Sequence, residues 1–198
     1  RISYYPNSEY TARADEILQY WEGHYQEAGK KPFMIPVGAS DGIGLWGYIA
    51  ACEELAADFR MHQITPGHII SATGSGGTQG GLTVGNSLFN LRAKVWGINV
   101  CDDADYFKKK VLDDMQQWQQ WYKQSLDVCQ LPINVIDGYV GAGYARASEA
   151  VFATIRRVAH LEGLVLDPVY TGKAFHGLLD QHAQGCFNDS KDIVFVHT

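Results

Sequence analysis

The stretch that decides the fold is SATGSGGTQGG, Ser71 to Gly81, which holds five glycines among eleven residues together with serines and threonines. It follows the apolar run His68-Ile69-Ile70 and precedes LTVGNSLFNL, so we interpret it as a loop between a buried strand and a helix. Glycines let successive backbone N–H groups converge, because no side chain blocks the approach. The start of a helix adds unsatisfied N–H groups and a partial positive charge. The stretch therefore predicts an anion site, and phosphate is its natural ligand.

Apolar periodicity outside this loop indicates that strands and helices alternate along the chain. This alternation predicts an α/β fold, with an open, mostly parallel sheet covered by helices on both faces. In such folds ligands bind in the crevice beyond the carboxyl ends of the strands, where this loop would lie. The expected helices are 10–29, 45–62, 80–91, 104–124, 146–163 and 172–185, and the expected strands are 32–37, 68–70, 94–100, 133–137 and 192–196.

Composition excludes several classes of function. A chain of 198 residues that is 46% hydrophobic can bury a real core, as one domain or a domain with an added lobe. The net charge of −6, with scattered Lys and Arg, offers no continuous basic surface, so we expect no nucleic-acid partner. We expect no membrane association, because no apolar run approaches spanning length and the first residues lack the apolar core of a signal peptide.

Cysteine and histidine spacing gives no sign of a metal site. The four cysteines stand far apart without a CxxC pair, which favours neither zinc nor a disulfide framework and fits a reducing cytoplasm. The seven histidines form no H-x-x-x-H pattern or other ligand spacing. We therefore expect a cytoplasmic protein without a bound metal.

Three kinds of phosphate loop compete for the glycine stretch. A Walker loop is excluded, because it needs Gly-Lys-Ser/Thr and this stretch has no lysine. A dinucleotide loop needs glycine where Gln79 stands, although Asp102 follows the next strand about where a ribose-binding acid would be. A coenzyme with one phosphate is the third possibility, and a flexible glycine turn without ligand is the structural alternative.

Three motifs resemble the D-cysteine desulfhydrase and 1-aminocyclopropane-1-carboxylate deaminase family of pyridoxal-phosphate enzymes. They are IPVGASDGIGLWGYIAA (35–51), SATGSGGTQGG (71–81) and LEGLVLDPVYTGKAFHGLLD (161–180), and they stand in the family's order. The resemblance implies a fold like the tryptophan synthase β subunit (fold type II), pyridoxal 5'-phosphate as cofactor, a small amino-acid substrate and a homodimeric complete enzyme. Residues 1–198 would form one enzyme domain, the later part of the family chain and mainly its large lobe.

The resemblance also implies roles for individual residues. Tyr170 of DPVYTGK matches the tyrosine that stacks on the coenzyme ring, and Thr171 matches the residue facing the pyridine nitrogen. Tyr144 in GAGYA is similar to a tyrosine near the substrate, although Ala145 and Arg146 stand where the family continues with Gly and a proline. The coenzyme phosphate would lie in the cradle formed by Gly74, Ser75, Gly76, Gly77 and Thr78. Without the motif, a half-buried core tyrosine and a threonine N-cap remain open for Tyr170 and Thr171.

The neutral Thr171 favours the desulfhydrase branch, because the deaminase branch has Glu at this position. The implied reaction is α-proton removal, loss of sulfide or another β-leaving group, and hydrolysis to pyruvate and ammonia. Lys173 is not the coenzyme lysine in the family, so we expect a surface or packing residue there.

The family's earlier segment, which holds the Schiff-base lysine, matches nothing in the sequence. We therefore expect a portion of a longer enzyme that is inactive by itself. Pairing with a second chain that carries the lysine, or a remnant that binds coenzyme without catalysis, are the alternatives.

Overall fold

The computed structural model describes residues 2–198, apart from the side chains of Asn7 and Thr11, and divides into two compact units, 1–36 and 37–198. In the first unit, α1 (Asn7–Glu27) carries Trp21, whose Nε1 donates a 2.8 Å hydrogen bond to the Tyr5 hydroxyl. The strand expected at 32–37 is wrong. Residues 30–36 form no strand, and the side chains of Phe33 and Ile35 are 69% and 63% exposed. Two prolines in this short run lack the N–H that a ladder needs.

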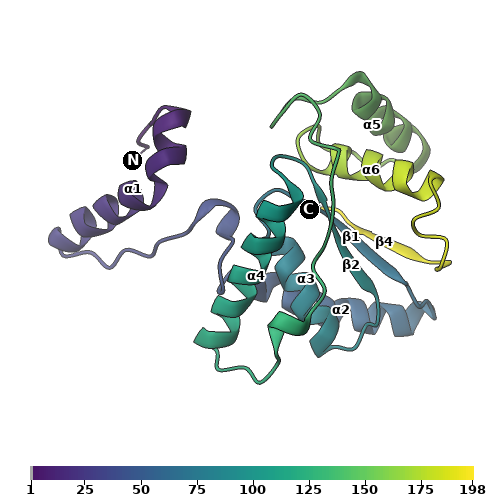
Figure 1. Cartoon of the computed structure of the whole chain (residues 1–198), viewed down its shortest axis with the longest axis horizontal. Helices are drawn as coiled ribbons and strands as arrows, with labels where there is room; N and C mark the ends of the chain where they lie inside the picture. Colours follow the sequence, from purple (N-terminus) through teal and green to yellow (C-terminus); the bar gives the residue numbers. More distant parts are fainter. Residues whose placement is uncertain (1) are drawn as a thin grey trace. The chain divides into compact units, whose positions relative to one another are not determined.

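A four-stranded parallel sheet forms the centre of the second unit, in the order β3-β2-β1-β4 (Figure 1). The strands are β1 (His68–Thr73), β2 (Lys94–Asn99), β3 (Asn134–Ile136) and β4 (Ile193–Val196). Because β1 pairs with β2 on one side and β4 on the other, the glycine loop that follows β1 begins near the middle of the sheet's carboxyl edge. The predicted parallel α/β sheet is confirmed.

Helices cover both faces of this sheet (Figure 1). Ile69 packs in a cluster with α2 and α3, whereas its neighbour Ile70 packs in a cluster with α6, and both side chains are fully buried. Strand side chains alternate between faces, so a strand that is apolar at consecutive positions needs cover on both. The elements are α2 (Leu45–His62), α3 (Gly77–Leu88), α4 (Ala104–Trp121), α5 (Glu149–Glu162), α6 (Thr171–Ala183) and the short 3₁₀ helices η1 (Val37–Ala39) and η2 (Val128–Gln130).

The glycines within α3 permit an unusually close approach of α2. A Cβ on Gly81 would lie 2.6 Å from the Leu45 carbonyl oxygen, and one on Gly85 would lie 2.7 Å from Cys52 Cβ. Neither contact is possible for a side chain, so these two positions require glycine. Part of the glycine content that suggested a loop therefore belongs to helix packing, and α3 begins at Gly77 rather than at residue 80.

Gly97 in β2 is the position where we expect a single methyl group to be most damaging. Its Cβ would lie 1.9 Å from Gln79 Oε1 and 2.1 Å from Thr73 Oγ1, two atoms that share a 2.8 Å hydrogen bond. Overpacking of this kind costs about 1–3 kcal/mol, so Gly97→Ala should lower the free energy of unfolding by that amount in urea titrations. Gly47→Ala is the matched control, because nothing lies within 4 Å of that Cβ. The free energy of unfolding of this control should rise by roughly 0.5–1 kcal/mol, because alanine is more favourable than glycine inside a helix. Equal effects at the two glycines would contradict this packing argument.

Candidate functional site

The glycine loop joins β1 to α3 through one left-handed residue. Gly76 precedes the helix with φ +96°, a conformation that disfavours any residue with a Cβ. The first helical hydrogen bond runs from Gly80 N to the Gly76 carbonyl at 2.8 Å. The N–H groups of the three residues between them therefore cannot bond within the helix, and they form a ready anion site at its start. This geometry would suit the predicted phosphate site, which stays a prediction.

A cavity of about 240 Å³ lies beside this loop at the carboxyl edge of the sheet. Four of the residues predicted for the site share its wall: Gly74, Ser75, Thr78 and Tyr170. Gly76 and Gly77 are buried and form the turn and helix start next to it. The remaining wall comes from Val37, Gly38, Ala72 and Thr198.

Two glycines allow the walls of the cavity to approach each other closely, because neither has a side chain. A Cβ on Gly74 would lie 2.9 Å from Tyr170 Cε1, so the tyrosine ring packs directly on the loop backbone. A Cβ on Gly38 would lie 2.3 Å from Ser75 Oγ. Tyr170 is 37% exposed, which leaves part of its ring open to a ligand. A flat ligand with a phosphate fits these walls, because the loop supplies the N–H groups and Tyr170 supplies an aromatic surface.

Ser40, Lys110 and Asp114 form a polar network that is hydrogen-bonded to the glycine loop. The sequence analysis did not predict this network. The buried Ser40 Oγ lies 2.7 Å from the Ser75 carbonyl oxygen and 2.8 Å from Asp114 Oδ2. Lys110 Nζ lies 2.6 Å from both oxygens of Asp114 and donates a 2.9 Å bond to the Ser40 carbonyl. Burial raises the pKa of Asp114, although Lys110 and Ser40 oppose this. The i, i+4 spacing of Lys110 and Asp114 could have indicated a pair, but not its partner Ser40.

Gln79 occupies the place where a dinucleotide loop would carry its last glycine. Its side chain is fully buried, with Oε1 accepting a 2.8 Å hydrogen bond from Thr73 and Nε2 donating a 2.8 Å bond to the Asn134 carbonyl. These bonds tie the end of β1 to β3 across the sheet. The Gln79 side chain therefore stabilises the sheet, and the loop gives no support to a dinucleotide site.

Thr171 lies at the start of α6 and is fully buried against Asp167. Its hydroxyl donates a 2.6 Å hydrogen bond to Asp167 Oδ2 and accepts a 2.9 Å bond from Asp167 N. Burial alone would raise the pKa of Asp167, but bonds from the Thr171 hydroxyl and three backbone N–H groups outweigh it, so the pKa is lowered. Thr171 is not in the cavity wall, and its contact with a pyridine nitrogen stays a prediction.

Tyr144 comes from a separate loop and meets Tyr170. The two hydroxyl groups are hydrogen-bonded, and the rings meet edge to face with centroids 5.9 Å apart. The Tyr144 bond is the main reason that the pKa of Tyr170 is raised to about 12, with burial adding to it. The structure therefore brings together two tyrosines that the sequence placed 26 residues apart, and Tyr170 stays protonated at neutral pH.

Lys173 is buried rather than on the surface. Its side chain is 1% exposed, and its ammonium group donates hydrogen bonds to backbone carbonyls of the loop that precedes Tyr144. Of the two expectations for this residue, the surface position is wrong and a buried position is observed. The apolar pattern of α6 gave no signal for this burial, since lysine is seldom buried without a partner.

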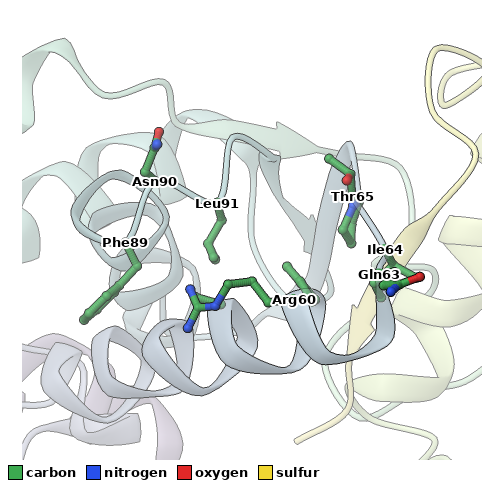
Figure 2. A pocket seen from close by; sticks show the side chains of 10 residues that line it. Arg60, Gln63, Ile64, Thr65, Phe89, Asn90 and Leu91 are labelled. Atoms are coloured by element: carbon green, nitrogen blue, oxygen red, sulfur yellow. The ribbon is translucent and has the colours of Figure 1, made fainter.

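A second cavity, of about 360 Å³, lies at the opposite edge of the sheet (Figure 2). Its wall comes from the end of α2 and the segments that lead into β1 and β2, and Arg60 extends from α2 toward Phe89 (Figure 2). None of the predicted site residues lines it. Ligands of parallel sheets bind at the carboxyl edge, so the smaller cavity is the candidate site.

Residues 2–198 show neither a cluster of metal ligands nor a membrane-spanning helix. In this range no cluster of three or more His, Cys, Asp or Glu side chains is arranged to hold a metal ion. Over the same residues, no helix is both long and apolar enough to cross a bilayer.

We predict that Tyr144→Phe lowers the pKa of Tyr170 from about 12 toward about 10, because the Tyr170 hydroxyl loses the Tyr144 oxygen to which it donates its proton. Absorbance at 295 nm measures phenolate formation during an alkaline titration. The Tyr170 signal is the difference between the titration curve of each protein and the curve of the same protein with Tyr170→Phe. An unchanged titration of Tyr170 would mean that the two hydroxyl groups do not interact in solution.

Curated proteins resemble the chain over most of its length. The chain is 37% identical over 198 residues to the mitochondrial bifunctional D-cysteine desulfhydrase/1-aminocyclopropane-1-carboxylate deaminase of Arabidopsis thaliana, covering 96% of this chain and 47% of the relative. It is 34% identical over 174 residues to the D-cysteine desulfhydrase of Serratia proteamaculans, covering 86% and 51%. The chain thus spans about half the length of these curated relatives.

A solved structure is similar as well. The crystal structure of an ACC deaminase homologue matches all of this chain and 57% of its own, with a TM-score of 0.82 and 30% identity. The model of the family described as "Pyridoxal-phosphate dependent enzyme" matches residues 4–198. The chain therefore belongs to the pyridoxal-phosphate dependent enzyme family, and the cofactor predicted from the sequence is the cofactor of that family.

Proposed function

We propose that the complete protein eliminates the β-substituent of a small amino acid such as D-cysteine. With one water molecule, D-cysteine gives pyruvate, ammonia and hydrogen sulfide. The observation that carries this proposal is the cavity where the glycine loop and Tyr170 of DPVYTGK meet, with Thr171 next in the chain. Relatives named D-cysteine desulfhydrase support it.

The residues of this chain would hold pyridoxal phosphate at two points. The backbone N–H groups from Gly74 to Thr78 would bind the phosphate, helped by the start of α3. The exposed part of the Tyr170 ring would lie against the coenzyme ring. When bound, the coenzyme supplies an electron sink for breaking bonds at the substrate α-carbon.

The tyrosine pair would act through hydrogen bonds rather than as a base. Because the pKa of Tyr170 is about 12, its phenol keeps its proton at neutral pH. Tyr144, whose side chain is 57% exposed, would reach the substrate from the same side. The two hydroxyl groups can therefore orient a polar substrate group or supply a proton to a leaving group.

A second candidate function is 1-aminocyclopropane-1-carboxylate deamination, which the names of the Arabidopsis relative and the crystallised homologue favour. Thr171 argues against it, since the deaminase branch carries Glu there. Our proposal also includes residues 1–198 as one enzyme domain, mainly the large lobe, in a cytoplasmic homodimer. The expectation that the chain by itself is inactive stays a prediction.

The branch assignment is tested with the full-length protein, D-cysteine and the cyclopropane amino acid, measuring sulfide and ammonia release respectively. We expect sulfide release by the unmodified protein and by Thr171→Ser, because serine keeps the hydroxyl group. Thr171→Glu should lose most sulfide release, because it places a carboxylate where a neutral group is expected. Circular dichroism checks that each variant folds, since Glu would face Asp167. Cyclopropane opening by the unmodified protein without sulfide release would overturn the assignment.

Phosphate binding by the loop is tested separately. Gly76→Val should weaken pyridoxal phosphate binding about tenfold, because a branched residue at φ +96° costs roughly 1–2 kcal/mol and distorts the loop. Binding of pyridoxal, which lacks the phosphate, should change far less. Tryptophan fluorescence measures both affinities, and Gly47→Ala again serves as the control. Equal weakening for the two ligands would show that the loop does not hold the phosphate.

A further inference from the structure

Lys173 is a buried cation whose donors are all directed at backbone carbonyls. Its Nζ lies 2.7 Å from the Val140 oxygen and 2.9 Å from the Gly143 oxygen. A third carbonyl, that of Val100 at the end of β2, lies at 3.5 Å. An ammonium group has three N–H donors, so each of them has an acceptor here.

No carboxylate compensates this charge. Within residues 2–198, none of the ion pairs includes Lys173. Burial lowers the pKa of Lys173, which is the expected result of removing an ammonium group from water. An apolar side chain of similar length would fill the same space without that desolvation cost. The ammonium group therefore contributes something that packing alone would not, namely its bonds to the two loop carbonyls.

Tyr139 fastens the start of the 138–146 segment to α6, because its hydroxyl donates a 2.6 Å hydrogen bond to Asp180 Oδ2 and accepts a 2.8 Å bond from Gln181 Nε2. The rest of the segment has fewer constraints. Four residues of the 138–146 loop adopt positive φ angles: Gly138, Gly141, Gly143 and Ala145. The backbone hydrogen bond recorded inside the loop is the 3.2 Å bond from Arg146 N to the Gly143 oxygen. A Cβ on Gly138 or Gly143 would meet nothing within 4 Å, so these parts of the loop are loosely packed. Beyond Tyr139, Lys173 therefore supplies a large share of the attachment of this loop to α6.

We propose that Lys173 is a positioning residue that holds the 138–146 loop so that Tyr144 reaches the Tyr170 hydroxyl beside the cavity. Tyr144 directly follows Gly143, whose carbonyl Lys173 binds, and Tyr170 lies three residues before Lys173. The start of α6 thereby sets both members of the tyrosine pair. The inference rests on the proposed function only where it assigns Tyr144 to the substrate, because the contacts themselves involve this chain alone.

The test compares Lys173→Met with Lys109→Met in the full-length protein. Lys109 is exposed on α4 and is the control. Amide hydrogen exchange at Arg146, whose N–H donates to the Gly143 oxygen, should speed up roughly tenfold or more in Lys173→Met, while exchange in β1 stays unchanged. The alkaline titration of Tyr170 should shift as it does in Tyr144→Phe, because both changes break the same hydroxyl contact. A residue with only a packing role would alter neither readout in this selective way.

Chemical rescue keeps the test decisive if the methionine variant does not fold. Lys173→Ala removes three methylene groups and the ammonium group, which together correspond to n-propylammonium. Adding n-propylammonium should restore slow exchange at the Arg146 amide, and n-propanol, which has one donor and no charge, should not. If neither variant folds even with n-propylammonium, Lys173 is required by the whole fold and the proposal is wrong. Unchanged exchange and titration in a folded variant would overturn it as well.

Kinetics then separate this inference from the proposed function. If the full-length enzyme releases sulfide, Lys173→Met and Tyr144→Phe should lower activity by non-additive factors, with the double variant close to Tyr144→Phe alone. Additive factors would show that Lys173 acts by another route. If no sulfide or ammonia is released, the proposed function fails, whereas hydrogen exchange and the Tyr170 titration still decide the role of Lys173.

Discussion

The path of the glycine loop requires residues without a Cβ, because its backbone passes close to a wall on each side. On one side the Tyr170 ring would lie 2.9 Å from a Cβ on Gly74, and on the other Ser40 would lie 3.3 Å from one on Gly77. The left-handed turn at Gly76 links these two tight points and starts α3. Any side chain here would push apart α6, the loop and the segment that carries Ser40. The cavity lies on the Tyr170 side of this loop, where Gly74, Ser75, Thr78 and Tyr170 line it.

Much of this arrangement could be predicted, because periodicity and turn chemistry are local. The helix at 45–62 has the predicted bounds, and Gly163 ends α5 with φ 69°, as glycine at that place indicates. The strand at 32–37 failed because an apolar run alone does not show whether a partner strand is present. Gln79 and Lys173 could not be placed from sequence at all. Both are polar residues whose burial is decided by carbonyl groups that lie 55 and 33 residues away along the chain.

The two lysines near the site differ in whether a carboxylate compensates their charge. Lys110 is partly exposed and pairs with a carboxylate, Asp114, so its charge is largely cancelled. Lys173 is buried and has only carbonyl dipoles as acceptors, so its positive charge persists where the dielectric is low. It lies close to Val100 and Cys101, and Cys101 Sγ in turn donates to the Gly74 carbonyl at 3.4 Å. An uncompensated cation here and the start of α3 act in the same direction, since both favour an anion in the loop.

The group to which the Thr171 hydroxyl donates its proton bears on which reaction the proposed site favours. In the structure that proton is donated to Asp167, whose lowered pKa keeps it ionised at neutral pH. If the proposed contact with the pyridine nitrogen forms while this bond is kept, Thr171 can offer that nitrogen only a lone pair. To donate a hydrogen bond to a neutral nitrogen, the hydroxyl must instead leave Asp167, and hydrogen bonds to charged groups are worth about 1.5–3 kcal/mol. The direction of the Thr171 hydroxyl would thus set which form of the nitrogen it can bond: a neutral nitrogen if the hydroxyl leaves Asp167, and a protonated nitrogen if the bond to Asp167 is kept. The carboxylate behind Thr171 would therefore take part in the choice of chemistry together with Thr171.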